Sequence, residues 1–322
     1  MVEAIGNTTK IENKMINLVY YIIFPGFLFT AVVGLLSYWV DRKVTARVQW
    51  RVGPPWWQNF ADFVKLLYKE TIIPKGSSKI TFLLAPIFGL SAVTIVSTLL
   101  WRTMIDNNST FIGDWIVVIY LLTIPSMSVI IGGFASKNPL ASLGASREMK
   151  LILAYELPFI LACLVPVIQS GGALKLGEIL KYQMNNGIIF GSLSGIIAFI
   201  VGILCMQAKL TLVPFDIPEA EQEIMEGPYI EYSGPPLGIF KLTRQMMLFV
   251  LPIFLTVIFL GGITFSGWHI LWGILKYVAL LVIIILIKNT NVRIRIDQAI
   301  RFFWGPMTGL AIIGIILAMI GL

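Results

Sequence analysis

An acidic run in the second half of the chain is the densest group of residues that could exchange protons. The run reads Pro-Phe-Asp-Ile-Pro-Glu-Ala-Glu-Gln-Glu-Ile-Met-Glu-Gly over residues 214–227, and one more carboxylate follows it, so the group comprises Asp216, Glu219, Glu221, Glu223, Glu226 and Glu231. Neighbouring carboxylates raise one another's pKa, which favours proton exchange near neutral pH. Two interpretations are open: a proton-handling cluster, and a solvated face or docking surface for a basic partner.

The element expected to carry these carboxylates is a short helix that begins at Pro218. Proline suits the first turn of a helix, and acidic side chains favour a helix N-terminus. In such a helix Glu219, Glu223 and Glu226 share one face, whereas Glu221 points elsewhere. The basic residues of the loop stand only at its ends, so the carboxylates must be solvated, protonated or paired with basic residues from elsewhere.

Glu156 is a second candidate, because it lies about two helical turns inside an apolar run that begins near residue 150. A charge at the bilayer centre costs about 2.5–3.5 kcal/mol, so intramembrane carboxylates are functional hypotheses by default. Pro158 frees backbone carbonyls beside it. Arg147 and Glu148 stand about two turns earlier. The alternative is that Glu156 snorkels or pairs with an arginine of a neighbour.

Composition predicts the solvent that surrounds these residues. Of 322 residues, 57% are hydrophobic and only 13% are charged, against about 25% charged in soluble domains. We therefore predict an all-α, polytopic membrane protein that forms a single membrane domain over 1–322. Two cysteines without a C-x-x-C spacing, and one histidine, argue against an iron–sulfur or zinc site in this chain.

About eight apolar runs are long enough to cross a bilayer core of about 30 Å. The predicted spans are 17–40, 80–101, 114–134, 150–170, 189–208, 241–262, 268–288 and 304–322. The loops after spans 1, 3, 5 and 7 hold 17 Lys and Arg, and the other loops between spans hold 3. The positive-inside rule then places loops at about 41–79, 135–149, 209–240 and 288–303 in the cytoplasm and both termini outside.

The first of these loops, at about 41–79, contains a periodic pattern of apolar residues that a simple linker would lack. Apolar residues at helical spacing between Trp57 and Glu70 predict an amphipathic helix at the membrane surface. Gly53 and the prolines after it predict a turn, and paired tryptophans suit a membrane interface. The basic residues of the loop either set topology or contact a soluble partner. The distribution of Lys and Arg over the loops indicates membrane orientation, so the net positive charge is not evidence of nucleic-acid binding. The sequence also has no P-loop, which would indicate a nucleotide-driven pump.

A succession of motifs resembles the H-subunit family of respiratory complex I over nearly the whole chain. The motifs are Gly53-Pro54 with Gln58, Asp62, Lys65 and Lys69-Glu70; Ala135-Ser136-Lys137-Asn138 with Gly144 and Arg147; Tyr155-Glu156-Leu157-Pro158; the acidic run; Glu231-Tyr232-Ser233-Gly234; and Arg293, Arg295, Asp297 and Gln298. The acidic run followed by Glu-Tyr-Ser-Gly is the most specific of them.

The first loop distinguishes two branches of that family. In the quinone-reducing branch, Gly-Pro usually continues with Asn and a longer glycine-containing stretch before the Gln. Here Gly53-Pro54-Pro55-Trp56-Trp57-Gln58 is shorter. The short form resembles the ion-translocating membrane subunit of group 4 membrane-bound NiFe hydrogenases and of related formate hydrogenlyase or sulfane reductase complexes. The resemblance therefore implies a respiratory hydrogenase complex of a prokaryotic cell membrane and puts a quinone site in doubt.

The resemblance implies a role for particular residues and partners. The residues implied to take part in proton transfer or coupling are Glu156, Arg147, Asp216, Glu219, Glu221, Glu223, Glu226 and Glu231. The residues implied to form the interface with a peripheral redox arm are Arg47, Arg51, Gln58, Asp62, Lys65, Lys69, Glu70, Arg293, Arg295 and Asp297. The implied partners are hydrogenase large and small subunits, a ferredoxin-type iron–sulfur subunit, antiporter-like membrane subunits and lipid.

In this view the chain holds no cofactor, and the 4Fe-4S clusters and the NiFe centre reside in partner subunits. It is an anchor and coupling subunit that links ferredoxin-driven proton reduction to H⁺ or Na⁺ translocation. A quinone-reducing complex I subunit or a sulfane reductase subunit is the alternative. A stand-alone secondary transporter, which would use Glu156 and the acidic loop as ion sites, is the remote one.

Overall fold

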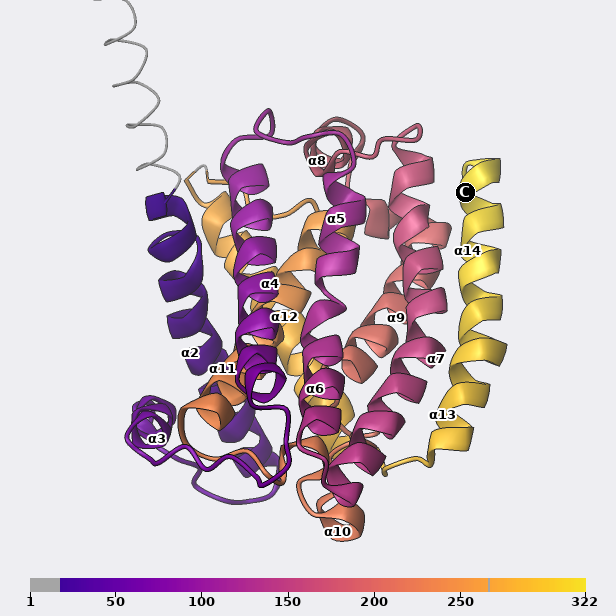
Figure 1. Ribbon diagram of the computed structural model, residues 1–322. Coiled ribbons are helices and arrows are strands. Elements are labelled where there is room, and N and C mark those ends of the chain that lie inside the picture. Colours follow the sequence, from indigo (N-terminus) through magenta and orange to yellow (C-terminus); the bar gives the residue numbers. More distant parts are fainter. Residues whose placement is uncertain (1–17, 266) are drawn as a thin grey trace, which may run out of the picture.

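A computed structural model of the chain describes residues 18–265 and 267–322, and this described part is built of helices without a strand (Figure 1). The segments long and apolar enough to cross a membrane are Leu18–Val48, Lys79–Ile105, Asp114–Ala135, Pro139–Gln169, Gly234–Phe259, His269–Thr290 and Ile296–Ile320. A shorter apolar helix, Leu193–Lys209, lies among them. These segments confirm the prediction of an all-α, polytopic membrane protein.

The elements follow one another along the chain with short connections. The helices that cross the bundle are α2 (Phe27–Val48), α4 (Lys79–Ile105), α5 (Asp114–Leu121) with α6 (Ile124–Ala135), α7 (Pro139–Gln169), α9 (Leu193–Lys209), α11 (Gly234–Phe259), α12 (His269–Thr290) and α13 (Ile296–Phe302) with η3 (Phe303–Met307) and α14 (Thr308–Ile320). The remaining elements are α3 (Gln58–Leu67), α8 (Leu176–Asn186), η1 (Ile189–Gly191), α10 (Glu221–Ile224) and η2 (Gly227–Tyr229).

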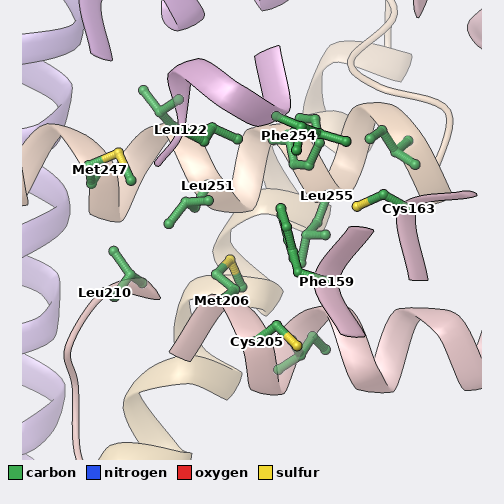
Figure 2. Packing of buried hydrophobic residues seen from close by; sticks show 14 of the residues in the cluster. Leu122, Phe159, Cys163, Cys205, Met206, Leu210, Met247, Leu251, Phe254 and Leu255 are labelled. Carbon is green, nitrogen blue, oxygen red and sulfur yellow. The ribbon is translucent and has the colours of Figure 1, made fainter. Parts of the chain in front are cut away.

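Helix α11 forms the centre of the bundle. Every residue from Met246 to Phe259 is buried, as expected of a helix that is apolar on all sides. Helices α2 and α4 pack on it, while α7 packs with α6, α9 and α14. Figure 2 shows the core, where Phe159 of α7 lies close to α11 and its ring centroid is 6.0 Å from that of Phe254.

The helices run further than the sequence indicated at several ends. Helix α2 continues to Val48, α11 begins at Gly234, and α7 begins at Pro139, so most of the predicted loop 135–149 is helical. The side chain of Asn138 caps α7 by accepting a hydrogen bond from the backbone N–H of Leu140 at 2.9 Å. Charged residues indicate loops in the sequence, but in the fold these segments continue the helices, and some of their charges form ion pairs, such as Arg147 with Glu223 and Arg244 with Glu219.

The third and last spans are interrupted helices. Span 3 breaks between α5 and α6, where Pro125 occupies the first turn of the second helix. The last span begins at Ile296, not at 304, and widens into a π-helical turn at η3, which contains Pro306. Proline removes a backbone donor at both places, so each span continues through an altered turn.

Two short helices mark one end of the bundle, which we call the loop face: α3 and α10, at the bottom of Figure 1. The amphipathic helix predicted between Trp57 and Glu70 is confirmed as α3. Helix α8, which the sequence did not predict, lies at the opposite end of the bundle, the end at which the C-terminus also lies (Figure 1). The orientation of these two ends relative to the cytoplasm stays a prediction.

Candidate functional site

Carboxylates of the acidic run meet arginines from two distant segments at the loop face. Glu223 accepts a hydrogen bond from Arg147 of α7 at 2.6 Å, and Arg293, just before α13, approaches it at 4.0 Å. Arg293 also lies 3.3 Å from a carboxylate oxygen of Asp216 and donates to the backbone oxygen of Asp216 at 2.8 Å. Of the options that the sequence left open, pairing with basic residues from elsewhere is the one that the fold uses here.

Glu219 points toward the bundle and pairs with Arg244 of α11 at 2.5 Å. The same guanidinium donates to the backbone oxygen of Thr211 at 3.1 Å. The side chain of Glu219 is 21% exposed and that of Arg244 is 36% exposed, so this carboxylate is better shielded from water than that of Glu223, whose side chain is 53% exposed. A charge pair gains strength as solvent is excluded.

The expected shared helical face of Glu219, Glu223 and Glu226 is wrong. Helix α10 covers only Glu221–Ile224, and Met225 ends it with a positive φ of 59°. Tertiary ion pairs pull Glu219 and Glu223 to different helices, which a single helical face would not permit. Glu226 is exposed and lines a cavity of about 180 Å³ together with Glu219. The side chain of Glu221 lies outside the described part of the structure.

The electrostatics of Glu223 differ from the prediction for a crowded carboxylate. The hydrogen bond from Arg147 is the main influence and lowers the pKa of Glu223, and the positive charges of Arg147, Arg293 and Arg295 add to it. The arginines therefore outweigh the opposing effect of burial on the pKa, so Glu223 stays ionised near neutral pH. Its role in the cluster is a fixed negative charge.

A small cavity is lined both by members of this group and by charged residues of the bundle helices. Its lining includes Glu148 of α7, Lys209 of α9, Glu219 and Arg244, and its volume is about 40 Å³. That volume, with polar groups around it, has room for one or two water molecules. The cavity therefore places carboxylates and basic groups from four segments around a space in which water could carry protons.

Glu148 is the most deeply buried carboxylate in this cavity. It is only 2% exposed, and among the described residues its Oε2 has no hydrogen-bond partner and no basic side chain forms an ion pair with it. A buried ionised carboxylate without a partner is costly. Glu148 is therefore a group for which protonation is the natural way to remain buried.

Glu156 also lies on α7, eight residues after Glu148, and it belongs to a buried ion pair. Lys209 Nζ lies 3.1 Å from Glu156 Oε2, and the Lys209 side chain is fully buried. The ammonium also lies over the ring of Phe159, 4.5 Å from its centroid. The sequence-level alternative, pairing of Glu156 with a basic neighbour, is thus realised within this chain, with a lysine in place of an arginine.

A further buried pair joins α2 to α12. Lys288 Nζ contacts both oxygens of Asp41, at 2.7 and 3.1 Å, and Asp41 is 1% exposed. A cavity of about 460 Å³ is lined by this pair and also by Asp216, Glu219 and Arg293. Arg244 and Glu219 therefore line both this cavity and the smaller one, so charged residues border two cavities that share part of their walls.

The Glu-Tyr-Ser-Gly motif serves the architecture and lies apart from these pairs. Glu231 binds the side chain of Asn138 at 2.5 Å, and Tyr232 donates to the backbone oxygen of Phe82 at 3.0 Å. Gly234 has a φ of +61°, and a Cβ there would lie 2.7 Å from the backbone oxygens of Lys69 and Glu70. Glu231 is therefore held by Asn138, and among the described residues no contact joins it to the ion pairs of the other carboxylates.

The residues assigned to a peripheral-arm interface stand at the loop face with varied surroundings. Asp62 is held by Gln58 at 2.8 Å and by Arg42 at 3.3 Å. The exposed members are Arg47, Arg51, Lys65, Lys69, Glu70, Arg295 and Asp297. Arg293 instead belongs to the acidic group, as described above. Exposure permits contact with a partner, and the interface itself stays a prediction.

Sequence reasoning missed several members of the site. Arg244 and Lys209 supply the counter-charges of Glu219 and Glu156, and Asp41 pairs with Lys288 across the bundle. In the sequence, Lys209 and Lys288 stand at the ends of apolar runs, where they count only as indicators of topology. The position of Glu148 could have been recognised from the sequence, because it stands about two helical turns before Glu156 on a similar helical face. The predicted span begins at residue 150, however, and so leaves Glu148 in the preceding loop.

Comparison with known proteins places this arrangement in a family. The family model described as NADH dehydrogenase matches residues 20–319. The chain is a member of the H-subunit family of NADH dehydrogenase. It is 32% identical to the H subunit of NADH-quinone oxidoreductase from Geobacillus thermodenitrificans (strain NG80-2), and the match covers 91% of each chain. The corresponding protein of Geobacillus kaustophilus (strain HTA426) is 30% identical over 94% of each chain.

A solved structure supports the same placement of this H-subunit family member. A chain of the membrane-bound sulfane sulfur reductase, an archaeal respiratory membrane complex, matches with a TM-score of 0.80 and 30% identity, over 91% of this chain and 96% of that one. The predicted family is therefore confirmed. These relatives are subunits of respiratory membrane complexes, which agrees with a multi-pass membrane protein that works with partner subunits.

Proposed function

We propose that this chain is the membrane anchor and ion-coupling subunit of a respiratory complex, which links electron transfer in a peripheral arm to H⁺ or Na⁺ translocation. The observation that carries the proposal is the series of charged groups from Arg147–Glu223 and Arg293–Asp216 at the surface, through Glu219–Arg244 and Glu148, to Glu156–Lys209. Such groups are expensive inside a membrane protein and mark proton or ion pathways.

The series works as a relay of charge. A change at the loop face that weakens one surface pair alters the field at the next pair, because these charges lie in partly dehydrated surroundings. Glu148 can respond by taking up or losing a proton through water in the 40 Å³ cavity. The displacement then reaches Glu156 and Lys209, from which neighbouring membrane subunits receive it.

The peripheral arm of our proposal is of the hydrogenase type, with the 4Fe-4S clusters and the NiFe centre in its large, small and ferredoxin-type subunits. The short loop Gly53–Gln58 supports this branch. A sulfane reductase arm is the second candidate, favoured by the structural match to the sulfane sulfur reductase complex. Quinone reduction is the third, favoured by relatives that are H subunits of NADH-quinone oxidoreductase.

Purification of the intact complex through a tag on this chain distinguishes these candidates. With reduced ferredoxin as donor, evolution of hydrogen is the expected result. Sulfide release from polysulfide, or reduction of a quinone, would replace the hydrogenase arm by the second or third candidate. Ion transport by this chain purified alone, without redox subunits, would overturn the whole proposal in favour of a secondary transporter.

A further inference from the structure

The end of α11 that lies away from the loop face, which we call its far end, is enclosed by the protein. Every residue from Thr256 to Phe259 is fully buried. A helix leaves its last carbonyl groups without partners of its own, and such a group is costly where water cannot reach it. The N–H groups of Leu260 and Gly262 donate to the carbonyl of Thr256 at 3.0 and 2.8 Å. The next carbonyls depend on side chains of other helices.

Two side chains from two other helices supply these donors. Gln183 of α8 donates through Nε2 to the backbone oxygens of Val257 and Ile258, both at 3.0 Å, and it is only 3% exposed. Lys276 of α12 donates through Nζ to the backbone oxygen of Leu260 at 2.5 Å. We call Gln183 and Lys276 the far-end cap. The cap ties the last turn of α11 to α8 and to α12 at once.

The positive charge of Lys276 suits this position better than a neutral donor would. Lys276 lies about two turns inside α12, an apolar helix, where a charge without compensation is costly. Among the described residues, no carboxylate forms an ion pair with it. The C-terminal end of a helix carries a partial negative charge, which attracts a cation. The far end of α11 is therefore the group that compensates the ammonium.

The same helix carries Arg244 nearer its other end, where the guanidinium pairs with Glu219. Arg244 precedes Leu260 by about 24 Å along the helix axis. Pro252, between them, removes one backbone hydrogen bond, but the buried residues from Met246 to Phe259 are packed on all sides by other helices. A rotation or slide of α11 at its far end therefore changes the direction in which the guanidinium points.

We propose that Lys276 is a positioning residue of the coupling site. Together with Gln183 it fixes the rotation and the height of α11, and so holds Arg244 against Glu219. Donors from two different helices resist rotation, because a turn of α11 toward one donor moves its carbonyls away from the other. The inference rests on the coupling function proposed above, and it adds a residue at the opposite end of the bundle from the acidic run.

Hydrogen–deuterium exchange of the intact complex tests the cap itself. Mass spectrometry follows the amides of Leu260 and Gly262 in a peptide that covers residues 256–264. Lys276→Met removes the ammonium, so the helix end frays and these amides should exchange about tenfold faster. Lys276→Arg retains the charge and the donors and should stay close to the natural protein. Lys181→Met, which removes an exposed lysine of α8 at the same end of the bundle, is the matched control.

Ion uptake into inverted vesicles, measured per electron transferred, tests the positioning role. Lys276→Met is expected to lower it about threefold in a fully assembled complex, as Arg244→Gln also should. The double variant should be no lower than Arg244→Gln alone, because both changes act through the same ion pair. Gln183→Leu, which removes the other half of the cap, replaces Lys276→Met in every measurement when that variant does not assemble.

Two sets of outcomes overturn the proposal. Amide exchange that is unchanged in Lys276→Met, or equally fast in Lys276→Arg or in Lys181→Met, would refute the cap. Additive losses in the double variant, or full ion uptake per electron in a Lys276→Met complex that is only less heat-stable, would refute the positioning role. A natural complex that translocates no ions would refute the proposed function instead, and the exchange rates would still report on the cap, because they do not depend on transport.

Discussion

Lys209 Nζ lies 3.1 Å from Glu156 Oε2, and it joins α9 to α7 inside the bundle through a lysine side chain that is fully buried. Glu156 is 19% exposed, and its Oε1 has no hydrogen-bond partner among the described residues. One oxygen is thus fixed by the ammonium while the other is free to receive a proton or a water molecule. This asymmetry suits a group that passes charge to a neighbour.

Glu156→Gln is expected to uncouple the complex without dismantling it. The glutamine amide oxygen can still accept the hydrogen bond from Lys209, but it cannot carry a proton. Ion uptake into inverted vesicles, measured per electron transferred, should fall severalfold while native electrophoresis shows an intact complex. Glu178→Gln, which removes an exposed carboxylate from the opposite end of the bundle, is the control. Unchanged ion uptake per electron in Glu156→Gln would contradict the coupling role.

Glu156→Ala separates the structural role of the same residue from its role in transport. Alanine leaves the buried ammonium of Lys209 without its partner, and breaking a buried pair on one side costs about 3–5 kcal/mol. We expect a lower thermal-unfolding midpoint for Glu156→Ala than for Glu156→Gln. The double variant Glu156→Ala with Lys209→Met should recover part of the loss, because no unpaired charge remains. Equal midpoints for all three variants would contradict the ion pair.

Glu148→Gln tests whether the unpaired carboxyl in the small cavity carries a proton. Glutamine has nearly the same size, so we expect assembly and electron transfer to continue, with ion uptake per electron lowered severalfold. Difference infrared spectroscopy supplies a second readout: a protonated carboxyl band that shifts in D₂O should be present in the natural protein and absent from Glu148→Gln. A band that persists in the variant would assign the proton to another group.

Glu223→Gln should affect acid stability in a defined direction. Because the Arg147 hydrogen bond lowers the pKa of Glu223, its ionised form stabilises the folded state at pH values above the ordinary value of 4.5. That contribution is lost as the pH falls through the lower, folded-state pKa. The pair is exposed, so its worth is below about 1 kcal/mol. The gap in unfolding midpoint between natural protein and variant should be constant above pH 4.5 and close below it; a gap that grows on acidification would contradict this assignment.

Tyr232→Phe should lower stability and leave coupling intact. The hydroxyl donates to the backbone oxygen of Phe82 at 3.0 Å, and the two rings stack with centroids 4.0 Å apart. Removal of the hydroxyl costs about 1 kcal/mol, whereas Tyr232→Ala also removes the ring and costs about 3–5 kcal/mol. Thermal unfolding ranks the two variants. Loss of ion uptake per electron in a fully assembled Tyr232→Phe complex would mean that the motif acts in transport.

The sequence determined the class of the protein, because hydrophobicity over runs of about 20 residues is a local property that needs no knowledge of contacts. The amphipathic helix α3 followed from the spacing of Phe60, Val64 and Leu67 for the same reason. The specific order of Tyr155-Glu156-Leu157-Pro158, the acidic run and Glu-Tyr-Ser-Gly identified the family. The helix ends were less predictable, because charged residues that indicate a loop in the sequence, such as Arg147 and Arg244, lie within helices and form ion pairs with distant segments.

Only the tertiary structure decided which charges meet. Glu219 and Arg244 are separated by 25 residues, Glu156 and Lys209 by 53, and Asp41 and Lys288 by 247. No local pattern encodes such pairs, because they depend on how whole helices pack around α11. The sequence shows the carboxylates and, through its apolar runs, predicts the membrane in which buried charge is costly. The fold supplied their counter-charges and gave Glu148 no ion-pair partner among the described residues, because pairing depends on what other helices bring to a side chain.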